Sequence, residues 1–227
     1  MAAVSAERLA SSLSCAALSA SGATLAVCPN TSDVVLYERE RDPKIGGWVE
    51  AETLKGHEGL VSGLSFDGAD RLVSSSHDRN SFVWTRRGSG SWVPELVVTK
   101  LSKAGLCVAF SPASSKFAIG SSEASVCVCY WDAERGLWAP RLIRKKHASS
   151  VTAVAWHPSG AMLATVSTDG HCRIFNVLVA GRWWAGGVGP GRLHLPHTSW
   201  RARRALQRWT APSGRRRCRA AGSATAC

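Results

Sequence analysis

Residues 147–175, HASSVTAVAWHPSGAMLATVSTDGHCRIF, contain three short segments in which apolar and polar side chains alternate. The segments VTAVAW, MLATVS and HCRIF are separated by the turn sequences HPSG and TDG. Alternation with a period of two is typical of a strand with one face buried, and Pro, Gly and Asp mark the turns between strands. This stretch therefore predicts three antiparallel strands joined by tight turns.

The polar and aromatic residues around these strands have a recognisable order. His147 precedes the first strand, Asp169 lies in the second turn, and Phe175 closes the third strand. This order is typical of a WD repeat, which forms one blade of a β-propeller. A repeat of this kind is expected to recur along the chain.

The same markers recur through residues 13–177 at nearly constant steps. The aromatic residues that close the third strand are Tyr37, Trp84, Tyr130 and Phe175, at steps of 47, 46 and 45 residues. The residues that close the first strand are Leu18, Phe66, Phe110 and Trp156, at steps of 48, 44 and 46 residues. A period near 45 residues in four-stranded units indicates an all-β propeller with about four blades over residues 13–177. We expect Tyr37, Phe66, Phe110, Tyr130, Trp156 and Phe175 to pack between blades.

Blade two contains the polar residues of a buried hydrogen-bond network. We expect His57, Asp78 and Trp84 to lie together with a hydroxyl from either Ser74 or Ser76, because buried polar atoms need partners. In blade four His147 and Asp169 are retained, but Phe175 has no N–H to donate. Each His–Asp pair also has the residue types of a catalytic or metal site. Their fixed place in the repeat favours a structural role.

The sequence contains no pattern that predicts an active site. There is no C-x-x-C pair, no histidine at zinc-ligand spacing and no Gly-rich phosphate loop after a strand. No nucleophile, base and orienting group recur together in the repeat. We therefore expect no enzyme, no catalytic or metal-binding residues and no cofactor.

The basic charge is concentrated after the repeats. The chain has a net charge of +12, and residues 178–227 contribute ten arginines with no lysine and no acidic residue. That segment is also rich in Gly and Ala, and we expect it to be a disordered tail, with residues 1–12 as a separate N-terminal segment. Its Arg and Trp residues leave open a nucleic-acid-binding role. No apolar run has the length of a membrane span.

Several motifs resemble a specific family. The segments CPNTSDVVLYE, HDRNSFVWT, VCVCYWD, AWHPSGAMLAT and DGHCRIF are similar to the first half of actin-related protein 2/3 complex subunit 1. The resemblance covers about residues 13–175 and implies part of a seven-bladed WD-repeat propeller. Because residues 178–227 resemble nothing in the family, we interpret them as the product of a frameshift or a mis-spliced exon and the chain as a truncated form.

The resemblance implies a non-catalytic scaffold role in actin filament nucleation and branching. The expected partners are the other subunits of that complex and actin, and the expected location is the cytoplasm and its actin cytoskeleton. No specific nucleic-acid partner is expected. Two alternatives remain open at this point: a WD-repeat adaptor outside the actin system, and a nucleic-acid binder acting through the basic tail. An arc of about four blades also exposes apolar surface at its two ends, which predicts aggregation or dimerisation.

Overall fold

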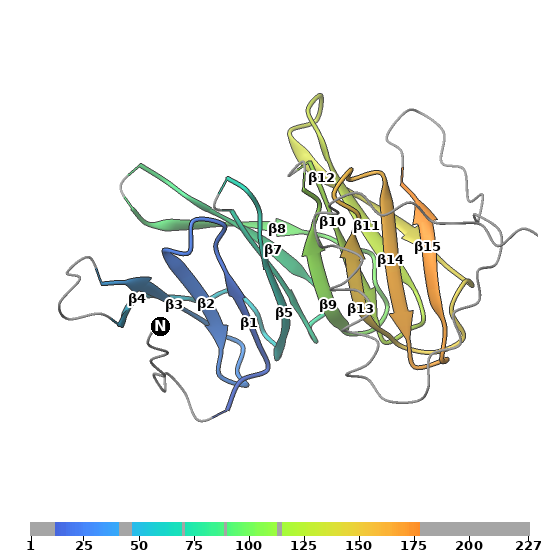
Figure 1. Ribbon diagram of the computed structural model, residues 1–227, viewed down its shortest axis with the longest axis horizontal. Helices are drawn as coiled ribbons and strands as arrows, with labels where there is room; N and C mark the ends of the chain where they lie inside the picture. Colours follow the sequence, from blue (N-terminus) through green and yellow to red (C-terminus); the bar gives the residue numbers. More distant parts are fainter. Residues whose placement is uncertain (1–11, 41–46, 70, 89, 113–114, 178–227) are drawn as a thin grey trace, which may run out of the picture.

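The computed structural model describes residues 12–40, 47–69, 71–88, 90–112 and 115–177. These residues form fifteen β-strands in four antiparallel sheets and contain no helix (Figure 1). The predicted all-β class is therefore confirmed. Within these ranges there is accordingly no helix long and apolar enough to cross a membrane. The predicted tail over 178–227 and residues 1–11 lie outside the described residues.

Blades one and two are four-stranded sheets whose strands follow one another in chain order. Blade one consists of β1 (Cys15–Leu18), β2 (Thr24–Cys28), β3 (Val34–Arg39) and β4 (Trp48–Leu54). Blade two consists of β5 (Val61–Phe66), β6 (Leu72–Ser76), β7 (Ser81–Arg86) and β8 (Trp92–Val97). The chain therefore completes one sheet before it starts the next. The two sheets lie side by side in Figure 1.

Blade three repeats this plan, and blade four has three strands among the described residues. Blade three consists of β9 (Gly105–Phe110), β10 (Lys116–Ser121), β11 (Val126–Asp132) and β12 (Leu137–Ile143). Blade four consists of β13 (Val151–Trp156), β14 (Met162–Ser167) and β15 (Cys172–Asn176). The two turns of blade four contain Gly160 at φ 66° and Gly170 at φ 79°. Glycine adopts this left-handed backbone without strain, which explains the short HPSG and TDG connections.

Paired residues of neighbouring strands form regular rows on the two faces of each sheet. We call the face of a blade that packs on the preceding blade its upstream face, and the face turned toward the next blade its downstream face. Paired residues across the first three strands form one row on each face. The upstream rows are Leu18–Leu25–Tyr37, Phe66–Leu72–Trp84, Phe110–Phe117–Cys129 and Trp156–Leu163–Phe175. The downstream rows are Ala17–Ala26–Leu36, Ser65–Val73–Val83, Ala109–Ala118–Val128 and Ala155–Ala164–Ile174.

The hydrophobic core lies in the three seams between blades. At each seam a downstream row of small or β-branched residues packs against a bulkier upstream row. Ala26 and Leu36 pack with Leu72 and Trp84 at the first seam. Val73 and Val83 pack with Phe110, Phe117 and Cys129 at the second, and Ala118 and Val128 pack with Trp156 and Leu163 at the third. Stacking therefore buries faces that no single sheet can bury alone, as in a WD-repeat propeller.

Candidate functional site

A chain of hydrogen bonds connects a turn of blade two to the middle of its sheet. The Nδ1 atom of His57 lies 2.7 Å from Oδ2 of Asp78, and its Nε2 atom lies 2.8 Å from Oγ of Ser74. The indole N–H of Trp84 donates to the same Ser74 oxygen at 2.9 Å. Ser74 therefore takes the place that the sequence left open between two serines, whereas Ser76 donates to a backbone carbonyl.

Hydrogen-bond donation in this network runs from Trp84 through Ser74 and His57 to Asp78. Burial alone would raise the pKa of Asp78, but hydrogen bonds from the Asn80 backbone and from His57 outweigh it and hold that pKa below its usual value. Because the Asp78 carboxylate only accepts, His57 donates through Nδ1 and accepts at Nε2 from Ser74. Trp84 can only donate, so it completes a network without an unpaired polar atom.

Buried imidazoles make the stability of this fold depend on pH. Burial lowers the pKa of both His57 and His147 from the ordinary value of 6.5. Below that pH the unfolded chain binds protons that the folded chain does not, so we expect the free energy of unfolding to fall as the pH falls below about 6.5. Urea unfolding at pH 7.5 and pH 5.5 measures this slope. Equal midpoints at the two pH values would contradict the assignment, and a His57→Gln variant should show a shallower slope.

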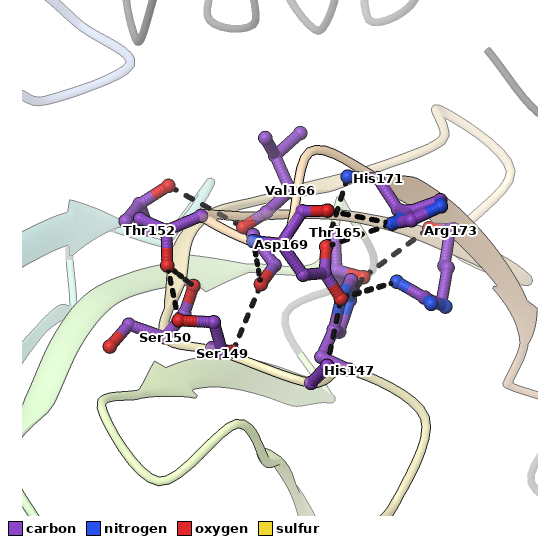
Figure 2. Close-up of polar contacts among 12 residues, drawn as sticks. His147, Ser149, Ser150, Thr152, Thr165, Val166, Asp169, His171 and Arg173 are labelled. Atoms are coloured by element: carbon purple, nitrogen blue, oxygen red, sulfur yellow. Dashed lines mark hydrogen bonds and ion pairs between the residues drawn. The ribbon is translucent and has the colours of Figure 1, made fainter. Parts of the chain in front are cut away.

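The corresponding network in blade four contains an arginine (Figure 2). The Nε2 atom of His147 lies 2.7 Å from Oγ1 of Thr165, and Nδ1 lies 3.2 Å from Oδ2 of Asp169. Nη1 of Arg173 lies 2.7 Å from the same His147 Nδ1 and 2.9 Å from the same Asp169 oxygen. Thr165 and Arg173 are paired across β14 and β15, so the sheet register itself brings the guanidinium to the histidine.

In blade four, Arg173 reverses the direction of hydrogen-bond donation through the histidine relative to blade two. A guanidinium can only donate, so Nδ1 of His147 accepts from Arg173 and the ring proton is on Nε2. This proton is donated to Thr165, whose hydroxyl lies 3.4 Å from the Arg173 carbonyl and donates to it. Hydrogen bonds from the backbone N–H groups of Ala148 and His171 outweigh burial and hold the pKa of Asp169 far below the usual range. Nη1 of Arg173 donates to the same carboxylate. Arg173 thus supplies a donor in a blade where Phe175 has none.

The two histidines are therefore expected to be opposite tautomers. Long-range ¹H–¹⁵N spectra of the imidazoles should show His57 protonated on Nδ1 and His147 protonated on Nε2. Replacing Arg173 by methionine removes the donor at Nδ1, so His147 should change to the Nδ1-protonated form and donate to Asp169. The spectrum of His57 is the internal control. Identical tautomers in the unsubstituted chain would contradict this assignment.

Neither network has the access that a catalytic group needs. His57 is 7% exposed and His147 is 6% exposed. Both ring nitrogens of each are hydrogen-bonded, those of His57 to Asp78 and Ser74 and those of His147 to Arg173 and Thr165. Among the residues that the structure describes, no group of three His, Cys, Asp or Glu side chains is placed to hold a metal ion. The geometry of both networks supports a role in fixing the turns of the repeat.

The expected packing aromatics fall into two groups. Phe66, Phe110 and Trp156 lie in the upstream rows of their blades, and the Trp156 indole donates to the Ala109 carbonyl across the third seam at 3.0 Å. Trp84 and Phe175 occupy one register position of the third strand, and Tyr37 is its equivalent in blade one. In blade three, however, that position is taken by Cys129. Tyr130 pairs with Lys116 and has the opposite orientation, because neighbouring residues of a strand face opposite sides.

Lys116 has a structural role that the sequence did not reveal. Its ammonium group is buried in the third seam, donates to the Val177 carbonyl at 2.9 Å, and lies 5.3 Å from the centre of the Trp156 ring. Burial lowers the pKa of this lysine. The contact joins blade three to the end of β15 across 61 residues of sequence, so no local pattern could predict it.

The exposed apolar side chains lie outside the three seams. Trp131 and Leu137 extend from the hairpin between β11 and β12 and are 41% and 43% exposed. Val49, Leu96 and Val98 are exposed on or beside the outer strands of blades one and two. Arg144, Lys145 and Lys146 are exposed in the connection between β12 and β13. These loops, hairpins and outer strands are therefore available to other molecules.

Comparison with known proteins identifies the repeat and its relatives. The WD40 model (WD domain, G-beta repeat) matches residues 48–85 and 139–176. Each match begins on the outer strand of one blade and ends on the third strand of the next, so it crosses a seam.

Three relatives carry the same name apart from a suffix. Actin-related protein 2/3 complex subunits 1A and 1B of Arabidopsis thaliana are each 43% identical over 182 residues, which is 80% of this chain and 47% of each relative. Subunit 1A-A of the same complex from Xenopus laevis is 33% identical over 168 residues, which is 74% of this chain and 44% of the relative. The chain thus spans about half the length of the curated relatives it matches.

Proposed function

This chain is a WD40-repeat homologue of actin-related protein 2/3 complex subunit 1, and we propose that it acts as a non-catalytic scaffold subunit of that complex. Its sequence identity to the Arabidopsis subunits is the observation that carries the proposal. In this role it binds other subunits of the complex, and through them actin, in the cytoplasm. Its contribution to filament nucleation and branching is to hold partners in place.

The division between buried and exposed surface supports this scaffold role. At the three seams the sheet faces are buried by stacking. The histidine networks are buried and fully hydrogen-bonded, which suits them to stabilise turns. Partners would therefore contact hairpins and connections such as the one that carries Trp131 and Leu137.

Reconstitution tests the proposal. The full chain is mixed with actin-related proteins 2 and 3 and the remaining subunits of the complex, and the mixture is separated by size-exclusion chromatography. Co-elution of the chain with the actin-related proteins is expected. Elution of the folded chain by itself would contradict the proposal and would favour a WD40 adaptor outside the actin system.

Two glycine variants provide a matched control for folding. Gly68→Ala lies in open space and should co-elute like the unsubstituted chain. Gly120→Ala disturbs the seam between blades three and four, as argued below, and should weaken co-elution. Equal behaviour of the two variants would show that the interaction does not require the stacked sheets.

A further inference from the structure

Two cysteines lie opposite each other in the sheet of blade one. Cys15 of β1 and Cys28 of β2 are paired in the antiparallel ladder, and both are free thiols. Opposed residues of antiparallel strands have Cα atoms about 4.5–5.5 Å apart, which is within the range that a disulfide spans. Cys28 belongs to the apolar cluster of the first seam and Cys15 packs against it, so both side chains lie on the face turned toward blade two. The strand register therefore positions the two sulfurs for a covalent bond.

The surroundings of the pair enclose one sulfur and leave the other accessible. Cys28 is 0% exposed, and its Sγ atom lies 3.1 Å from the carbonyl oxygen of Thr31. Cys15 is half-buried, and its Sγ atom lies 3.7 Å from the carbonyl oxygen of Val61 at the start of blade two. The same Val61 oxygen accepts the hydroxyl of Ser14 at 2.7 Å. A small molecule can therefore reach the pair at Cys15.

The two thiols also influence each other's ionisation. A hydrogen bond from the Cys15 thiol outweighs burial and lowers the pKa of Cys28 to about 6. At neutral pH the pair therefore contains one thiolate and one thiol that share a proton. Transfer of this proton from Cys15 to Cys28 places the negative charge on the accessible sulfur, and the thiolate is the nucleophilic form of cysteine.

We propose that Cys15 and Cys28 form a modification site at which hydrogen peroxide oxidises the two thiols to a reversible cross-strand disulfide. The Cys15 thiolate attacks one oxygen of the peroxide, so that an S–O bond forms, the O–O bond breaks, and the departing hydroxide takes the proton of Cys28 to give water. The Cys28 thiolate then attacks the sulfenic acid of Cys15. The S–S bond forms, the S–O bond breaks, and the second hydroxide takes up a solvent proton. The two sulfurs lose two electrons, and the peroxide gains them as it becomes two water molecules.

The other cysteines that the structure describes lack this combination of pairing and access. The Sγ atoms of Cys127 and Cys129 are 3.7 Å apart, but both residues are 0% exposed in the second seam. Cys107 has the register position of Cys15 in blade three, but the residue opposite it is a glycine. Cys172 lies opposite a valine. The inference does not depend on the proposed function, because it uses the register and surroundings of one cysteine pair.

The disulfide would tie the first strand to its neighbour. It closes the loop of residues 15–28, and a cross-link of this kind restricts how far the joined segments can open. The amides of β1 should therefore exchange with solvent more slowly in the oxidised chain than in the reduced chain. Small thiols should reverse the change, since they attack the disulfide and reduce it.

Peptide mapping of the full chain after treatment with hydrogen peroxide at neutral pH tests the inference. Remaining thiols are alkylated in denaturant without reductant, and the chain is digested with trypsin. No Lys or Arg lies between Arg8 and Arg39, so residues 9–39 form one peptide, which contains only Cys15 and Cys28. We expect this peptide to carry no alkyl group and to be lighter by two hydrogen atoms. The disulfide should form at least about tenfold faster in the folded chain than in urea, because the fold positions the sulfurs.

Two serine variants test the roles of the cysteines. Cys28→Ser removes the second thiol, so Cys15 should stop at the sulfenic acid and be labelled by dimedone. Cys107→Ser is the matched control and should form the disulfide like the unsubstituted chain. Alkylation of both Cys15 and Cys28 after peroxide treatment of the folded chain would overturn the inference. Equal rates of disulfide formation in the folded and the urea-unfolded chain would also overturn it, and this comparison needs no substitution.

Discussion

Replacing Trp84 by alanine is expected to lower the free energy of unfolding by about 3–5 kcal/mol. The side chain is 2% exposed and packs in the first seam with Ala26 and Leu36 of blade one. Its removal leaves a cavity between two sheets, and it also deprives Ser74 of the N–H that closes the hydrogen-bond network of blade two. Chemical denaturation followed by intrinsic fluorescence or circular dichroism measures the loss.

Two further variants separate the causes of this loss. Trp84→Phe keeps an aromatic ring in the seam but removes the donor to Ser74, so its effect should be about 1–3 kcal/mol. Trp131→Ala is the matched control, because Trp131 is 41% exposed and lies at the hairpin between β11 and β12. Its cost should be clearly smaller than that of Trp84→Ala. Equal losses at positions 84 and 131 would contradict the assignment of Trp84 to a seam.

Replacing Gly120 by alanine is expected to lower the free energy of unfolding by about 2–3 kcal/mol through overpacking. A Cβ atom at this position would lie 2.7 Å from Sγ of Cys107, 2.8 Å from Cγ1 of Val151 and 2.9 Å from the Val151 carbonyl oxygen. Cys107 belongs to the same blade, but Val151 begins blade four. The added methyl group must therefore push the two blades apart at the third seam.

Gly68→Ala is the control for this substitution. No atom lies within 4 Å of a Cβ at Gly68, so its effect should stay within about 0.5 kcal/mol. Urea midpoints of the two variants and of the unsubstituted chain give the comparison. If Gly120→Ala were as stable as Gly68→Ala, blades three and four would not approach each other as closely as the structure shows.

The fold class followed from the sequence because its signals are local. Each strand alternates apolar and polar residues, and the turns carry Pro, Gly and Asp, so period and spacing were sufficient to predict sheets that repeat about every 45 residues. The third-strand marker of blade three shows the limit of this reasoning. Tyr130 has the expected aromatic character, but Cys129 occupies the register position, because a shift of one residue moves a side chain to the other face.

The contacts between distant residues were less accessible from the sequence. His57 and Asp78 lie together as their places in the repeat suggest, but the choice of Ser74 required the register of β6 against β7. Arg173 appeared to be an ordinary polar residue of a strand until its pairing with Thr165 brought its guanidinium to His147. Lateral register, which no local pattern encodes, decides these contacts.

The central claim is that successive sheets are stacked face to face, with their middle strands inside. Amide hydrogen exchange of the purified chain, resolved by mass spectrometry, tests this most directly. The account predicts that β6 and β10, in which every residue is buried, exchange most slowly and that the exposed hairpin around residues 132–137 exchanges fastest. Exchange of β6 and β10 as fast as that of the hairpin would contradict the stacked arrangement.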